Sequence, residues 1–143
     1  MSKKICIIED EPALLEMYKV KFEAEGYDVY VAADGIDGLK VIKEKMPDLV
    51  LLDLVMPKMN GFKVLDELRS DPKTKDLLIY VFSNLGQSDE IDQGLKEGAD
   101  GYFVKSNLTP TELARKVKII LAKPEKHNPQ PSRSLKLGLN RVA

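Results

Sequence analysis

Residues 48–61 read Asp-Leu-Val-Leu-Leu-Asp-Leu-Val-Met-Pro-Lys-Met-Asn-Gly. The run Leu49–Leu52 is apolar at every position, which is typical of a strand covered on both faces of a parallel sheet. Asp53 ends the run, and Pro57 and the glycine at 61 indicate a turn before a helix. Pro57 fixes φ, and Gly61 permits backbone conformations that are costly for other residues. The stretch predicts a buried strand that presents a carboxylate at its end.

Four further apolar runs flank this strand, and helical spacings separate them. The runs are Ile5–Ile8, Val29–Val31, Leu77–Phe82 and Tyr102–Val104. Between them, apolar residues repeat every three or four positions, at Leu14/Tyr18/Phe22, Leu39/Ile42/Met46, Leu65/Leu68, Ile91/Leu95 and Leu113/Val117/Ile120/Leu121. Helix-boundary signals agree, with Pro12 and Gly26 around the first helix, Gly98 after the fourth and a capping box at Thr109–Glu112. The alternation predicts an α/β fold, an open parallel sheet with helices on both faces.

Composition excludes several classes of function. The 22 Lys+Arg and 23 Asp+Glu give a net charge of −1, from which we expect no direct nucleic-acid binding. The single cysteine, Cys6, is expected to be a small buried hydrophobe, and the single histidine, His127, argues against zinc sites and histidine-based triads. No stretch is long enough for a signal peptide or a membrane span, so we expect a cytoplasmic protein with no membrane partner.

Polar side chains stand at the ends of four predicted strands. Glu9 and Asp10 follow the first strand, Asp53 the third and Lys105 the fifth, and Ser83 ends the fourth. Because the carboxyl ends of parallel strands meet at one edge, these residues are expected to share a pocket. Three carboxylates beside one lysine call for a cation, and oxygen-only ligands suit Mg²⁺.

Such a pocket can transfer a phosphoryl group to a carboxylate. Asp53 is the predicted nucleophile, because an aspartate can form an aspartyl phosphate. The reaction needs in-line positioning, a metal and a cationic clamp, for which Glu9 and Asp10 would hold the metal and Lys105 would be the clamp. Ser83 can donate a hydrogen bond to the attached phosphoryl group. Each residue alone is more simply a turn, cap or surface residue, so the joint occurrence carries the argument.

Four motifs together resemble the receiver domain of two-component response regulators, the CheY-like family. The motifs are Ile7–Pro12, Asp48–Gly61, Phe82–Asn84 and Gly98–Lys105. The resemblance covers residues 3–122 and implies a flavodoxin-like, five-stranded parallel sheet of order 2-1-3-4-5 with helices on both faces. It implies a receiver domain at 3–123, followed by a proline-containing basic tail or linker at 124–143.

The resemblance also implies a site. Asp53 would accept a phosphoryl group from a histidine kinase or phosphotransfer protein, and self-phosphorylation and self-dephosphorylation would be the only catalysis. Mg²⁺, or Mn²⁺ in its place, would be held by Glu9, Asp10, Asp53 and the backbone carbonyl of Val55, with Asp10 a direct ligand. Lys105 would pair with the phosphoryl oxygens.

Ser83 and Tyr102 resemble the family's switch pair, in which the hydroxyl moves toward the phosphoryl group and the ring turns inward. The output surface would comprise the helix around 91–95, the strand 102–104 and the helix around 113–121, facing a partner that the sequence does not name. The sequence leaves open whether phosphorylation produces a homodimer and whether an output domain follows. The tail could be a linker or could add a strand or short helix to a partner.

Residues that flank the predicted site differ from the family pattern or are variable in it. Asn84 stands where the family usually has alanine or glycine, and Ser106 where a cis proline commonly follows the lysine. Either the bond between Lys105 and Ser106 is cis, at a cost of about 3–4 kcal/mol, or the loop differs. The apolar Val55 and Leu85 cannot hydrogen-bond an attacking water, so we expect slow loss of phosphate. Met56 and Pro57 complete the flanking set.

Three other functions remain as alternatives. A haloacid-dehalogenase-like phosphohydrolase also uses an aspartate nucleophile, but it has a second aspartate where this chain has Val55. A flavin or nucleotide binder needs a phosphate-cradling loop after the first strand, where the acids Glu9–Glu11 would repel phosphate. A pseudo-receiver would bind partners without phosphorylation, and its chemistry residues should be degraded, whereas here they are intact.

Overall fold

The computed structural model describes residues 2–123, so the predicted tail at 124–143 lies outside the described residues. Strands and helices alternate along the chain, as expected. The elements are β1 (Lys4–Ile8), α1 (Pro12–Ala24), β2 (Asp28–Ala32), α2 (Gly35–Lys45), β3 (Leu49–Leu52), α3 (Gly61–Ser70), β4 (Ile79–Ser83), α4 (Ser88–Lys96), β5 (Gly101–Val104), a 3₁₀ turn η1 (Lys105–Asn107) and α5 (Pro110–Ala122).

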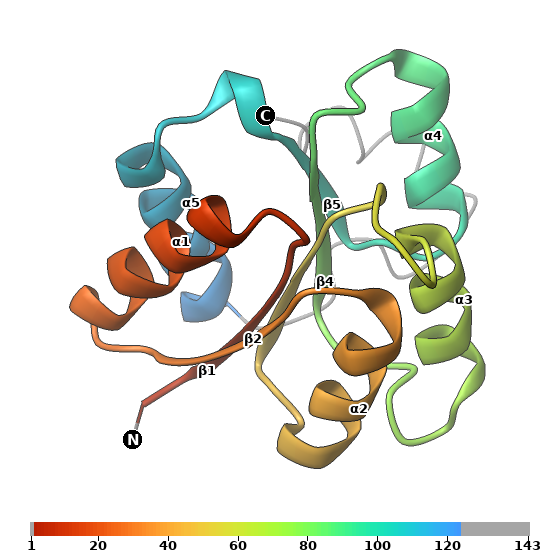
Figure 1. The fold of residues 1–143 in the computed structure, drawn as a ribbon, viewed down its shortest axis with the longest axis horizontal. Coiled ribbons are helices and arrows are strands. Elements are labelled where there is room, and N and C mark those ends of the chain that lie inside the picture. The colour runs from red at the N-terminus through yellow and green to blue at the C-terminus, as the bar shows by residue number, and fades with distance from the viewer. Residues whose placement is uncertain (1, 124–143) are drawn as a thin grey trace.

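The five strands form one parallel sheet in the order β2-β1-β3-β4-β5, which confirms the predicted fold class and strand order. Helices α1 and α5 cover one face, and α2, α3 and α4 cover the other (Figure 1). The direction of strand addition reverses between β1 and β3. In such sheets a crevice forms outside the carboxyl ends of the strands at this point.

The core consists of two layers because successive residues of a strand face opposite sides of the sheet. Cys6 and Ile8 of β1 pack with residues of α2, α3 and α4, whereas Ile5 and Ile7 pack with residues of α1 and α5. Strands β1, β3 and β4 are therefore covered on both faces. This explains why their sequences are nearly continuous apolar runs.

The predicted glycine and capping-box signals mark the helix ends, but the predicted apolar stripe of α2 is one residue too long. Gly26 and Gly98 adopt positive φ after α1 and α4, and the side chains of Thr109 and Glu112 exchange hydrogen bonds with each other's backbone N–H groups. Met46 does not extend the apolar stripe of α2, because the helix ends before it. Its φ is 47°, its N–H donates to a carbonyl of the last turn, and its side chain is exposed.

Strand β4 begins at Ile79, two residues later than the apolar run suggested. The N–H of Leu77 donates to the carbonyl of Thr74 at 3.0 Å, which closes a turn after α3. A backbone group engaged in a turn cannot also join the sheet ladder. The apolar pattern therefore includes the approach to the strand as well as the strand itself.

We expect the Cys6 thiol to be inert in the folded protein. Burial raises its pKa to about 12, and the thiolate is the reactive form. A thiol-reactive disulfide reagent at pH 8 should therefore label the native protein only as fast as it unfolds, and should label it promptly in guanidinium. Prompt labelling of the native protein at its single cysteine would contradict this prediction.

Candidate functional site

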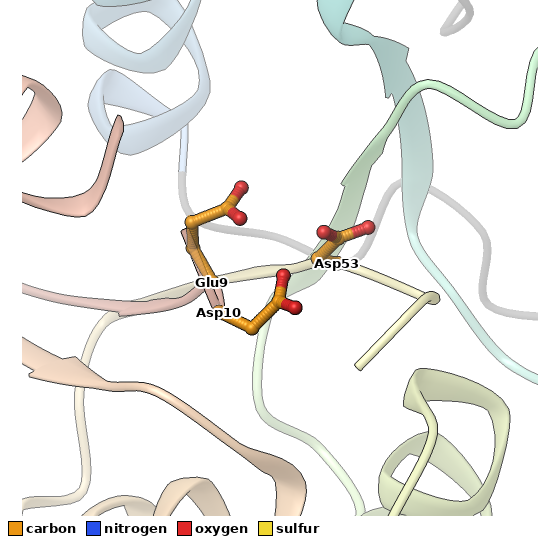
Figure 2. Close-up of side chains that lie close together, drawn as sticks. All are labelled: Glu9, Asp10 and Asp53. Carbon is orange, nitrogen blue, oxygen red and sulfur yellow. The ribbon is translucent and has the colours of Figure 1, made fainter. Parts of the chain in front are cut away.

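Backbone hydrogen bonds carry the sheet one residue past β1 and β3. The N–H of Glu9 donates to Ala32 at 3.0 Å, and the N–H of Asp53 donates to Ile8 at 3.0 Å. These bonds place the two acids at the carboxyl edge, at the switch point of the sheet. In Figure 2 the side chains of Glu9, Asp10 and Asp53 lie close together, and each contributes an oxygen within 4.8 Å of the other two.

The acids line an open cleft of about 310 Å³. Its lining residues are Glu9, Asp10, Glu11, Leu14, Asp53, Val55, Ser83, Asn84, Leu85 and Lys105. Two of them, Glu11 and Leu14, were not predicted as site residues, although Glu11 belongs to the acidic motif and is the N-cap of α1, and Leu14 lies in the first turn of that helix. Met56 and Pro57 were predicted to flank the site but are not among the lining residues, and the Met56 side chain packs in the core.

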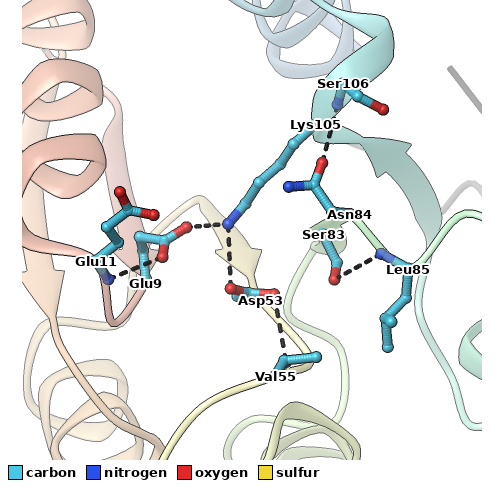
Figure 3. Close-up of polar contacts among 9 residues, drawn as sticks. All are labelled: Glu9, Glu11, Asp53, Val55, Ser83, Asn84, Leu85, Lys105 and Ser106. Carbon is cyan, nitrogen blue, oxygen red and sulfur yellow. Dashed lines mark hydrogen bonds and ion pairs between the residues drawn. The ribbon is translucent and has the colours of Figure 1, made fainter.

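Lys105 reaches between two of the acids. Its Nζ forms a close ion pair with Oε1 of Glu9 and lies 3.1 Å from Oδ2 of Asp53 (Figure 3). The three side chains are nearly buried, with exposed fractions of 9% for Lys105, 3% for Glu9 and 8% for Asp53. A charge pair at this depth is only weakly screened by salt.

The pKa values at the site reflect burial and this pairing. Burial raises the pKa of Glu9, against the opposing effects of the Lys105 ammonium and the N–H of Glu11. Burial alone would lower the pKa of Lys105, but its hydrogen bond to Glu9 and the charge of Asp53 outweigh burial and raise it. Lys105 is therefore cationic over the whole physiological pH range.

The donor set fits a hard divalent cation. Glu9, Asp10 and Asp53 offer carboxylate oxygens, and Mg²⁺ prefers oxygen ligands at about 2.0–2.1 Å and keeps several waters. Both oxygens of Glu9 already have protein partners, Lys105 and the N–H of Glu11, whereas Asp10 is exposed. The open cleft leaves room for water ligands beside Asp10.

The loop between β3 and α3 folds back onto Asp53. The N–H of Gly61 donates to Leu54 at 2.9 Å, and a Cβ at position 61 would lie only 2.3 Å from the carbonyl oxygen of Asp53. Glycine is therefore required at position 61 because the backbone of Asp53 lies so close, and not because φ is unusual. The sequence had suggested backbone freedom as the reason, and the structure corrects this. Among the described residues, positive φ in a glycine occurs at Gly26 and Gly98.

The side chains of the predicted switch pair, Ser83 and Tyr102, both form hydrogen bonds with the backbone of Leu85. Ser83 is buried, and its Oγ accepts a hydrogen bond from the N–H of Leu85 at 3.3 Å. Tyr102 is completely buried, and its hydroxyl donates to the carbonyl of Leu85. The Tyr102 ring therefore already lies inside the protein core, and burial raises the pKa of its hydroxyl. A displacement of the Ser83 hydroxyl would disturb the same residue that holds Tyr102.

The loop after β5 resolves the alternative left open at Lys105. Residues 2–123 contain no cis peptide bond, so the bond between Lys105 and Ser106 is trans and the loop differs from a cis-proline loop. The chain passes directly from β5 into η1. The N–H of Ser106 donates to Oδ1 of Asn84 at 3.1 Å.

The doubly wound sheet carries acids at its switch point and a hydroxyl and a lysine from the next two strands, which is the arrangement that the resemblance to signalling receiver domains implies. The chain matches the family of response regulator receiver domains over residues 5–118, and it belongs to that family. It is the receiver part of a two-component response regulator. The resemblance inferred from the motifs is thereby confirmed.

The relatives are response regulators, which are signalling proteins. The DNA-binding dual master transcriptional regulator RpaA of Synechocystis is 40% identical over 112 residues, which cover 78% of this chain and 46% of that protein. The phosphate regulon regulatory protein PhoB of Rhizobium meliloti is 39% identical over 87% of this chain and 56% of its own. A putative response regulator structure from Chloroflexus aurantiacus aligns with a TM-score of 0.78 and 30% identity, covering 86% of this chain and all of that one.

One expectation about partners is wrong. The net charge of −1 suggested that no nucleic acid is bound, yet curated relatives are described as DNA-binding regulators. The chain spans about half the length of those relatives, so its charge balance carries no information about the part of those relatives that it does not match. A kinase as phosphodonor is consistent with the family. Between residues 2 and 123, no helix is long and apolar enough to cross a membrane.

Proposed function

We propose that this chain is the phosphoacceptor of a histidine-to-aspartate relay in the cytoplasm and that Asp53 receives the phosphoryl group. The observation that supports this most is the Asp53 carboxylate, held 3.1 Å from the Lys105 ammonium in a cleft shared with Glu9 and Asp10. A carboxylate oxygen of Asp53 bonds to phosphorus as the bond from phosphorus to the donor nitrogen or oxygen breaks. The leaving group keeps that electron pair.

The neighbouring residues have separate tasks in this proposal. Asp10, Glu9, Asp53 and the carbonyl of Val55 would hold Mg²⁺ or Mn²⁺, which when bound neutralises charge on the phosphoryl oxygens. Asp10 is the direct ligand because it is exposed and both oxygens of Glu9 are engaged. Lys105 holds a phosphoryl oxygen, and its contact with Glu9 keeps the ammonium at the site.

The output follows from the contacts of Leu85. After transfer, the hydroxyl of Ser83 turns to the phosphoryl group and gives up the N–H of Leu85, while Tyr102 stays inside beneath α4. This local change biases the surface of α4, β5 and α5 toward a partner-binding state. Because the relatives are transcriptional regulators, we propose that residues 3–123 are a receiver unit that controls transcription.

A direct experiment tests the phosphoacceptor function. The protein is incubated with acetyl phosphate and Mg²⁺, and its intact mass is measured. We expect the gain of one phosphoryl group with Mg²⁺ and no gain when EDTA is present. No gain in the presence of Mg²⁺ would contradict the proposed function and would favour the pseudo-receiver alternative.

We expect apolar flanking residues to make the phosphorylated form long-lived. Val55 is 58% exposed at the cleft, and neither it nor Leu85 can hydrogen-bond an attacking water. Val55→Asn or Leu85→Glu should therefore speed phosphate loss by about threefold to tenfold, the equivalent of one hydrogen bond. The decay of the phosphorylated mass after donor removal measures this rate.

A matched control for this prediction is Val20→Asn. Val20 is similarly exposed, at 55%, but lies on α1 and outside the set of cleft residues. It should leave the decay rate unchanged. If the cleft variants decay no faster than the parent, the proposed cause of a long lifetime is wrong.

A further inference from the structure

Two residues that depart from the family pattern meet in space. Asn84 follows β4 and Ser106 follows Lys105, which comes directly after β5. The N–H of Ser106 donates to Oδ1 of Asn84 at 3.1 Å (Figure 3). The side chain of one unusual residue therefore binds the backbone of the other.

This bond continues the sheet past its last rung. The regular pairing of β4 with β5 ends where Ser83 lies opposite Val104. Asn84 lies one residue beyond the end of β4, and Ser106 lies two residues beyond the end of β5. The Asn84 side chain accepts the hydrogen bond that a backbone carbonyl would accept within the sheet. Lys105 lies between the last rung and this bond, so its backbone is held to the end of β4 on both sides.

The bond also defines the path of the chain beyond Lys105. A backbone N–H at position 106 is required, and proline has none. A side-chain acceptor at position 84 is required as well, and neither alanine nor glycine has one. Both features are present in the trans loop, whose 3₁₀ turn η1 begins at Lys105.

We propose that Asn84 is a positioning residue, which through Ser106 holds the trans loop that aims the Lys105 ammonium at Glu9 and Asp53. Asn84 and Ser106 thus act as one unit that replaces a cis proline. The effect of this unit on phosphoryl transfer rests on the proposed function. Its effect on the conformation of the loop is independent of the proposed function.

The kinetic test is a double-mutant cycle on the rate of phosphorylation by acetyl phosphate and Mg²⁺. Asn84→Ala should slow the reaction by about twofold to tenfold, the equivalent of one ordinary hydrogen bond. Ser106→Ala keeps the N–H and should react like the parent. Ser106→Pro should be slow alone but should add no further slowing in the Asn84→Ala background. Fully additive slowing, or an Asn84→Ala protein as fast as the parent, would overturn the proposal.

Further measurements separate positioning from general stability. The melting temperature and the Mg²⁺ affinity by calorimetry should be nearly unchanged in Asn84→Ala, whereas a merely structural role would lower the melting temperature. Amide exchange by NMR should show a protected Ser106 N–H in the parent and a faster one in Asn84→Ala. If the parent gains no phosphoryl group, the proposed function fails, and the exchange rate still decides whether Asn84 holds the loop. Equal exchange in both proteins would overturn the proposal.

Discussion

Asp53→Asn is expected to gain no phosphoryl group from acetyl phosphate and Mg²⁺ under conditions in which the parent gains one. The amide has the shape of the carboxylate but lacks its charge and is a poor nucleophile for phosphorus. The fold should survive, because the backbone bond from Asp53 to Ile8 remains and Lys105 keeps Glu9 as a partner. Intact mass measures the gain, and peptide mapping of the parent should place the group on Asp53.

Asp48→Asn is the matched control for this experiment. Asp48 precedes the same strand at its opposite end, where its carboxylate accepts a hydrogen bond from the N–H of Lys4 at 2.7 Å. It should be phosphorylated like the parent. An undiminished gain in Asp53→Asn would show that another residue is the acceptor, and the proposed assignment of Asp53 would be wrong.

Arg69→Met is expected to destabilise the protein by about 3–5 kcal/mol, the usual effect of breaking a buried ion pair from one side. Arg69 lies in the last turn of α3, and its side chain is only 16% exposed. Its guanidinium donates to the Asp100 carboxylate at 3.0 Å and to the carbonyls of Gly98, Lys75 and Leu77 at 2.8, 2.9 and 2.7 Å. One side chain thus joins α3 to the approaches of β4 and β5.

Urea unfolding measures this loss, with Lys63→Met as control. Lys63 lies on the same helix and pairs with Glu67 at 3.5 Å, but both side chains are about half exposed, at 56% and 43%. An exposed pair contributes about 0–1 kcal/mol, so the control should unfold near the parent's midpoint. Equal losses in the two variants would contradict a special role for Arg69. Since Arg69 is not among the cleft residues, the folded fraction of the variant should still be phosphorylated.

Much of the fold was predictable because its determinants are local along the chain. The apolar run Leu49–Leu52 indicates a strand covered on both faces, and Pro12 and Gly26 mark the ends of a helix that the structure confirms. The gathering of the acids with Lys105 was predictable for a related reason. Carboxyl ends of parallel strands share one edge, whatever the strand order. The order itself came from the resemblance to the family, since periodicity does not contain it.

Local patterns failed where a residue's environment is built by distant parts of the chain. Met46 continues the spacing of its stripe, yet the helix ends before it and its side chain is exposed. Gly61 was expected for its backbone freedom, whereas it is needed because the Asp53 carbonyl lies against it. No local pattern marks Arg69 as a buried structural residue, because its partner Asp100 is 31 residues away.

The sequence by itself determined the layers of this protein and the edge of the sheet at which its acids gather, because hydrophobic period, chain breakers and parallel strand direction are properties of neighbouring residues. Tertiary structure alone decided the contacts made there. The bond from Ser106 to Asn84 and the ion pair of Lys105 with Glu9 join residues 22 and 96 positions apart. Such contacts depend on strand register and side-chain rotamers, which are settled only when the sheet and its loops pack together.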